Sequence, residues 1–114
     1  GNLKIVKLLL SKTDNVNVQY GHDLTILMWA SGYGRHEVAK VLLDAGANAN
    51  LQDDRGRSSL MMAAKANHTE VLIELLNRGA NASLKDNEGK SVFDLAAEEN
   101  NEKVIQILRQ QSKS

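Results

Sequence analysis

The stretch Asp53–Lys85 reads DDRGRSSLMMAAKANHTEVLIELLNRGANASLK, and its pattern recurs on both sides at a spacing of 33 residues. The tetrapeptide Gly-Ala-Asn-Ala begins at Gly46 and again, 33 residues later, at Gly79. The turn sequence Asp53-Asp54-Arg55-Gly56 returns as Asp86-Asn87-Glu88-Gly89. A period in this range indicates a stack of small units, none of which can bury its apolar face alone.

One unit predicts two short helices between turns. Gly56 can take the positive φ that the first turn requires, and Ser58 then provides an N-cap hydroxyl. The first helix is expected over residues 60–64, where small alanines let a neighbouring helix approach closely. The second is expected over residues 69–77, with apolar side chains at i, i+1, i+4 and i+5. Gly79 follows at the place where a helix ends in a left-handed residue.

In this register the copies resemble the ankyrin repeat, whose consensus runs D-x-x-G-x-T-P-L-H-x-A-A-x-x-G-H-x-E-V-V-x-L-L-L-x-x-G-A-D-x-N. Residues 20–52 match it at Thr25, Leu27, Ala30, Gly34, Glu37, Val38, Leu42, Leu43, Gly46, Ala47 and Asn50. Residues 53–85 match at Asp53, Gly56, Leu60, Ala63, Ala64, His68, Glu70, Val71, Leu75, Leu76, Gly79 and Ala80. A third set comprises Asp86, Gly89, Ala96, Ala97, Val104 and Leu108.

The resemblance implies an all-α fold, an ankyrin-repeat solenoid of helix-turn-helix units with short hairpin-like loops and about three and a half repeats. Residues 1–19 correspond to a partial first repeat, with only the second helix and its loop. Residues 20–52 and 53–85 are two full repeats. Residues 86–114 form a C-terminal capping repeat with a polar tail, because terminal repeats expose a polar face.

The copies depart from the family at the start of the first helix. The family's proline and histidine are missing from every copy, so we expect modest stability. Ser91 and Asp94 have the spacing of a capping box, which can compensate in the last unit. Tyr20 and Asp23 replace the turn aspartate and glycine of the first tip, which is therefore expected to be irregular.

Asn17 and Asn50 match the asparagine between repeats that some ankyrin-like proteins present to an asparaginyl hydroxylase. The alternative, which we favour, is that both are hydrogen-bonded turn residues. His68 matches a structural histidine of the family, and we favour this structural role over a catalytic one.

Composition narrows the function classes. The chain has 114 residues with 14 Lys plus Arg and 14 Asp plus Glu, whereas proteins that bind nucleic acid through phosphate contacts carry a positive excess. No apolar run approaches the roughly 18 residues that cross a bilayer. There is no cysteine for a disulfide or a thiolate metal site. We expect a cytoplasmic protein with no nucleic-acid partner, no membrane partner and no cofactor.

Arrangements of residues typical of catalysis are missing from the sequence. It has no nucleophile elbow, phosphate-binding loop or zinc-protease helix. The acidic pairs Asp53-Asp54 and Glu98-Glu99 are expected to be solvated surface residues rather than general acids or bases. The chain is therefore predicted not to be an enzyme.

In ankyrin-like proteins the hairpin tips and the exposed side of the first helices form the concave face that binds a partner. Trp29 and Tyr33 stand four residues apart and share a helix face, and aromatic and arginine side chains are enriched at binding hot spots. The residues expected to bind a partner are Leu24, Trp29, Tyr33, Arg55, Arg57, Met62, Lys65 and Lys90, and Leu95 is placed on the same face. Two alternatives stay open: Trp29 packs between repeats, and the arginines and Lys65 are only a solvated cluster.

The function predicted from the sequence is a protein-protein interaction module that acts as a scaffold or adaptor for a protein or peptide partner. Replacing Tyr33 and Arg57 by Ala is expected to abolish capture of the partner and to leave the helical circular dichroism unchanged. The alternative is a structural segment whose uncapped edge, at Ile5, Leu8 and Leu9, stacks on upstream repeats or on another copy. We favour a monomer whose edge continues into upstream repeats.

Overall fold

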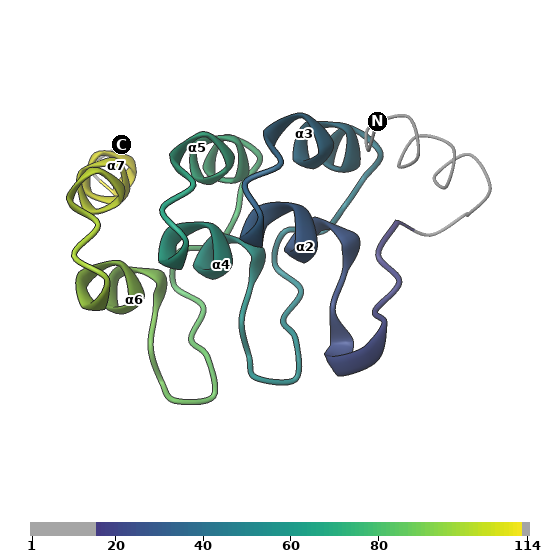
Figure 1. Ribbon diagram of the computed structural model, residues 1–114, viewed down its shortest axis with the longest axis horizontal. Helices are drawn as coiled ribbons and strands as arrows, with labels where there is room; N and C mark the ends of the chain where they lie inside the picture. The colour runs from purple at the N-terminus through teal and green to yellow at the C-terminus, as the bar shows by residue number, and fades with distance from the viewer. Residues whose placement is uncertain (1–15, 113–114) are drawn as a thin grey trace.

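The computed structural model describes residues 16–112 as a stack of three helix pairs, shown in Figure 1. The first helices are α2 (Ile26–Gly32), α4 (Ser59–Lys65) and α6 (Val92–Glu98). The second helices are α3 (His36–Asp44), α5 (Thr69–Asn77) and α7 (Glu102–Ser112). The two sets form two parallel rows, and the hairpin tips extend away from the row of first helices. The predicted all-α repeat solenoid is confirmed.

Some predictions lie outside the described residues. The apolar edge formed by Ile5, Leu8 and Leu9 and most of the partial repeat at 1–19 belong to residues 1–15. The stacking or self-association proposed for that edge and the repeat boundaries at 20, 53 and 86 stay predictions.

Each first helix begins with a capping box, and two of the three boxes use a methionine sulfur. The Thr25 hydroxyl accepts from the Met28 amide at 3.1 Å, and the Thr25 amide donates to Met28 Sδ at 3.4 Å. Ser58 and Met61 repeat this pair of contacts at 3.3 and 3.5 Å. The methionines that replace the family's histidine therefore still satisfy the N-cap amide.

The third first helix uses a carboxylate in the same place. The Ser91 amide donates to Asp94 Oδ2 at 2.9 Å, and the Ser91 hydroxyl donates to the same oxygen at 3.3 Å. This confirms the capping role predicted for Asp94. A carboxylate near a helix N-terminus also interacts favourably with the helix dipole.

The hairpin tips stack on one another through their backbones. The Asp54 amide donates to the His22 carbonyl at 3.0 Å, and the Asn87 amide donates to the Arg55 carbonyl at 2.9 Å. The first tip contains a 3-10 turn at Gly21–Asp23, with positive φ at two residues that are not glycine. Its predicted irregularity is confirmed.

Side-chain amides connect successive repeats beside the tips. Asn17 Oδ1 accepts from the Asn48 amide at 2.6 Å, and Asn50 Oδ1 accepts from the Asn81 amide at 2.7 Å. Both asparagines are therefore hydrogen-bonded turn residues, as favoured from the sequence. His68 is also a structural residue, because its Nε2 lies 3.2 Å from the Gly32 carbonyl oxygen.

The core lies between the two helix rows. Ala30, Ala63 and Ala96 recur at the 33-residue step and are fully buried, which lets the first helices pack closely. Leucines from both rows fill the space between them. The continuous core holds the first helices and tips in fixed register, and this register determines the surface described next.

Candidate functional site

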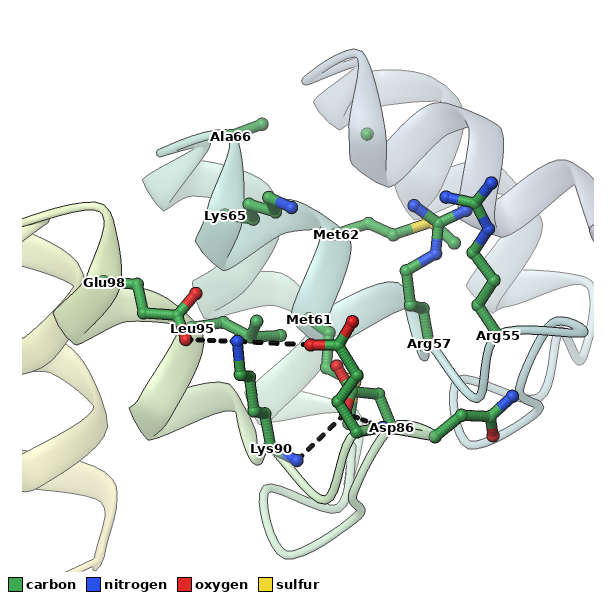
Figure 2. A pocket seen from close by; sticks show the side chains of 13 residues that line it. Arg55, Arg57, Met61, Met62, Lys65, Ala66, Asp86, Lys90, Leu95 and Glu98 are labelled. Carbon is green, nitrogen blue, oxygen red and sulfur yellow. Dashed lines mark hydrogen bonds and ion pairs between the residues drawn. The ribbon is translucent and has the colours of Figure 1, made fainter.

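A cleft of about 540 Å³ opens where the tips meet the first helices α4 and α6 (Figure 2). Met61, Met62, Ala66 and Leu95 provide its apolar side chains, of which Met61 and Leu95 are buried. Charged residues of the two neighbouring tips surround them. The structure brings together five of the residues expected to bind a partner: Arg55, Arg57, Met62, Lys65 and Lys90. Leu95 lines the cleft but is buried, so the prediction that it is exposed is wrong.

Arg57 is held against the tip by a buried carboxylate. Asp53 Oδ2 accepts from both Nε and Nη2 of Arg57 at 2.9 Å, while Asp53 Oδ1 accepts from the amides of Arg55 and Arg57 at 3.0 and 2.8 Å. Asp53 is only 6% exposed. The expectation that both Asp53 and Asp54 are solvated is therefore wrong for Asp53, which closes the tip through four hydrogen bonds.

Arg57→Ala should destabilise the protein because it leaves the buried Asp53 carboxylate without its cation. We expect a loss of about 1.5 kcal/mol in the free energy of unfolding, discounted because Arg57 is partly exposed. Arg55→Ala is the matched control, and surface replacements of this kind usually stay within about 0.5 kcal/mol. Urea unfolding followed by circular dichroism measures both. Equal losses in the two variants would show that Asp53 does not depend on Arg57.

Lys90 joins the second tip to α6. Its Nζ lies 2.6 Å from Glu98 Oε2 and 3.2 Å from Glu88 Oε2. These hydrogen bonds, the one to Glu98 above all, raise the pKa of Lys90, so its ammonium stays charged at neutral pH. Because Lys90 is already paired with two carboxylates, it contributes less to attracting an anion than its charge suggests.

Arg55 and Lys65 are the two cations of the cleft that form no ion pair with another described residue. Both side chains are exposed, and no carboxylate within residues 16–110 pairs with either. Figure 2 shows Arg55 on the tip beside Arg57 and Lys65 on α4, with the Met62 side chain extending from α4 toward the two arginines. Arg55 and Lys65 therefore flank an apolar strip, which Met62 forms together with the buried Met61 and Leu95.

Trp29 of α2 and Tyr33, the C-cap of that helix, form an exposed aromatic pair near the cleft, although neither ring lines it. The rings of Trp29 and Tyr33 lie 5.7 Å apart between centroids at an interplanar angle of 44°. Trp29 is 42% exposed and Tyr33 66%, so Trp29 is not enclosed between repeats. Gly32 lines the cleft, and Trp29, three residues earlier, shares its helix face. Leu24 is half-buried and does not line the cleft.

The second helices carry a different charge network. Arg78, the C-cap of α5, binds Asp44 of α3 at 2.6 Å and Glu74 of α5 at 3.0 Å. Its hydrogen bond to Asp44 is the largest cause of its raised pKa. His36 Nε2 lies 3.3 Å from Glu74 Oε1. These residues bind one another across α3 and α5, so the network ties two repeats together. The sequence signal for it was Glu74 and Arg78 at i, i+4.

The fold and this surface define a class of protein, the helix-turn-helix repeat solenoids, whose binding surfaces are extended and concave. A family model described as ankyrin repeats (3 copies) matches residues 1–53 and 27–114, so the chain belongs to the ankyrin-repeat family. Ankyrin repeats are generally protein-protein interaction modules and are typically not enzymes. No curated protein matches the chain. Within the described residues, no helix is long and apolar enough to cross a membrane.

Proposed function

We propose that this chain is a protein-docking module whose partner binds the face formed by the tips and by α2, α4 and α6. The observation that supports this most is the cleft at α4, where free cations flank an apolar strip next to two exposed aromatic rings. Aromatic and arginine side chains around a desolvated centre are the typical composition of a binding hot spot. On the second helices, Asp44 and Glu74 are already paired with Arg78 and offer less to a partner.

In this proposal the chain acts as an adaptor through binding at this surface and catalyses no reaction. A monomeric cytoplasmic adaptor that binds neither nucleic acid nor membrane stays a prediction. The partner is a protein or peptide, and its chemical character is taken up below.

A comparison of captured proteins tests the docking face. The immobilised chain, a Tyr33→Ala/Arg55→Glu variant and an Ile73→Ala/Lys40→Glu variant are incubated with the same extract and compared by quantitative mass spectrometry. The first variant alters the proposed face, and the second makes the same kinds of change on exposed residues of α5 and α3. Arg55 is chosen in place of Arg57 because Arg57 supports the tip.

We expect specific partners to be retained by the unaltered chain and by the α3/α5 variant, and to fall about tenfold or more with the Tyr33→Ala/Arg55→Glu variant. Thermal unfolding of the three proteins checks that each is folded. Loss of the same partners from the α3/α5 variant, with full retention by the other, would place docking on the second helices and refute the proposal.

A further inference from the structure

Some charged side chains of the cleft form ion pairs with one another, and others do not. Toward α6, the carboxylates of Glu88 and Glu98 are paired with Lys90. Asp86 Oδ1 accepts from the amides of Glu88 and Lys90, both at 2.9 Å. Arg55, on the tip before α4, and Lys65, on α4 itself, have no such partners among residues 16–110. Lys90 balances only one of these three carboxylates, so a docked segment meets net negative charge on the α6 side and positive charge at Arg55 and Lys65.

Apolar side chains run across the first helices in register with these charges. Trp29, Met62 and Leu95 occupy the same position in successive repeats, one on each of α2, α4 and α6. Their exposure falls from Trp29, through the half-buried Met62, to the buried Leu95. An apolar side chain of a partner therefore finds the most uncovered surface at Trp29 and Tyr33.

The spacing of the repeats determines how far apart the contacting side chains of a bound segment must be. Packed helices lie about 8–10 Å apart, and an extended chain advances about 3.3 Å per residue. An extended segment that crosses the first helices therefore passes from one repeat to the next in about three residues. Because side chains of an extended chain alternate between its two faces, those that reach Arg55 and Lys65 are two and four residues from the one on the aromatic pair, about three on average.

We propose that the docked segment is an extended acidic peptide with one bulky apolar residue about three positions from a pair of carboxylates. The apolar side chain packs on Trp29 and Tyr33, and the carboxylates pair with Arg55 and Lys65. This inference rests on the proposed function and adds to it the chemistry of the partner. Charge complementarity also predicts faster association at low salt, because steering by exposed charges is screened as ionic strength rises.

The fluorescence of Trp29 provides the test, because it is the single tryptophan of the chain. The probe is a blocked nine-residue peptide of Gly and Ser that carries one Phe and two Glu, placed two and four residues from the Phe so that all three side chains share one face. Three further peptides replace both Glu by Gln, both Glu by Lys, or Phe by Ala. Each is titrated into the full chain at low and at high salt.

We expect saturable quenching or a spectral shift with the Phe/Glu peptide, and binding weaker by about tenfold with the Gln peptide, the Ala peptide or high salt. The Arg55→Glu/Lys65→Glu variant should lose a similar factor. A Lys40→Glu/Lys103→Glu variant, with the same charge change at exposed sites on α3 and α7, should bind as the unaltered chain does.

Equal or tighter binding of the Gln or Lys peptide would overturn the acidic character of the partner. Equal binding of the Ala peptide would overturn the apolar anchor, and equal loss in both charge variants would remove Arg55 and Lys65 as the contacts. If no peptide binds while partner capture still depends on Tyr33 and Arg55, the peptide chemistry is wrong and the docking function stands.

Discussion

Leu75→Ala is expected to lower the free energy of unfolding by about 3 kcal/mol, because it opens a cavity in the core. Leu75 is 0% exposed and lies on α5, the middle second helix, which contacts α3, α4 and α7. Removing its side chain leaves a cavity in the core that the helices share. Because each repeat is stabilised by its neighbours, the loss should spread to the repeats on both sides.

Ile73→Ala is the control on the same helix, because Ile73 is 40% exposed. It should cost about 0.5 kcal/mol or less, as surface replacements usually do. Urea unfolding followed by circular dichroism gives both values. If the two replacements cost the same, Leu75 does not occupy the centre of the core as the structure has it.

Gly56→Ala is expected to cost about 3 kcal/mol, because strain and a steric clash add together. Gly56 has φ +78°, which an L-residue rarely adopts. An added Cβ would lie 2.8 Å from the backbone nitrogen of Asn87 and 3.0 Å from the carbonyl carbon of Asp86. Both atoms belong to the next tip, so the replacement should separate the two tips that line the cleft.

Gly79→Ala separates the two causes. Gly79 has φ +86°, but an added Cβ there meets no atom within 4 Å. It should therefore show the strain alone, about 1 kcal/mol. Thermal and urea unfolding of the two variants measure the difference. A Gly56→Ala variant as stable as Gly79→Ala would mean that the tips do not pack against each other at this residue.

Local features of the fold could be predicted from the sequence because they depend on residues close together in the chain. The second helix expected over residues 69–77 is observed at Thr69–Asn77, and Ser58 caps α4 as expected. Gly56 and Gly79 both have the expected positive φ. Each of these features follows from hydrogen bonds or dihedral angles within a few residues, and the 33-residue step repeats them.

Contacts that depend on side-chain direction were harder to predict. Comparison with the family shows that Met28 and Met61 replace its histidine, but it does not predict that their sulfur atoms accept from the N-cap amides. The position of Asp53 in a tip predicts a solvated carboxylate. In the structure the carboxylate turns inward and pairs with Arg57, which the sequence alone does not indicate. Such pairings depend on the rotamers and on how closely the tip packs.

In the candidate site too, the sequence predicts which residues share a face but not which of them form ion pairs. Arg55, Met62 and Lys65 were placed on one face by their positions in the unit, and the structure brings them to one cleft. The link from Lys90 to Glu98 joins a tip to a helix and requires the packing of the whole repeat. Which cations stay free for a partner therefore emerged only from the three-dimensional contacts.

The most direct test of the docking face is a map of backbone amide shifts by NMR when a partner retained in the capture comparison is added to the ¹⁵N-labelled chain. The largest shifts are expected on the first helices and tips, centred on Trp29, Tyr33, Arg55 and Lys65. Residues of α3 and α5 that face away, such as Lys40 and Ile73, should change little. Shifts concentrated on those second helices, with the cleft residues unmoved, would contradict the proposal that this chain docks its partner on the concave face.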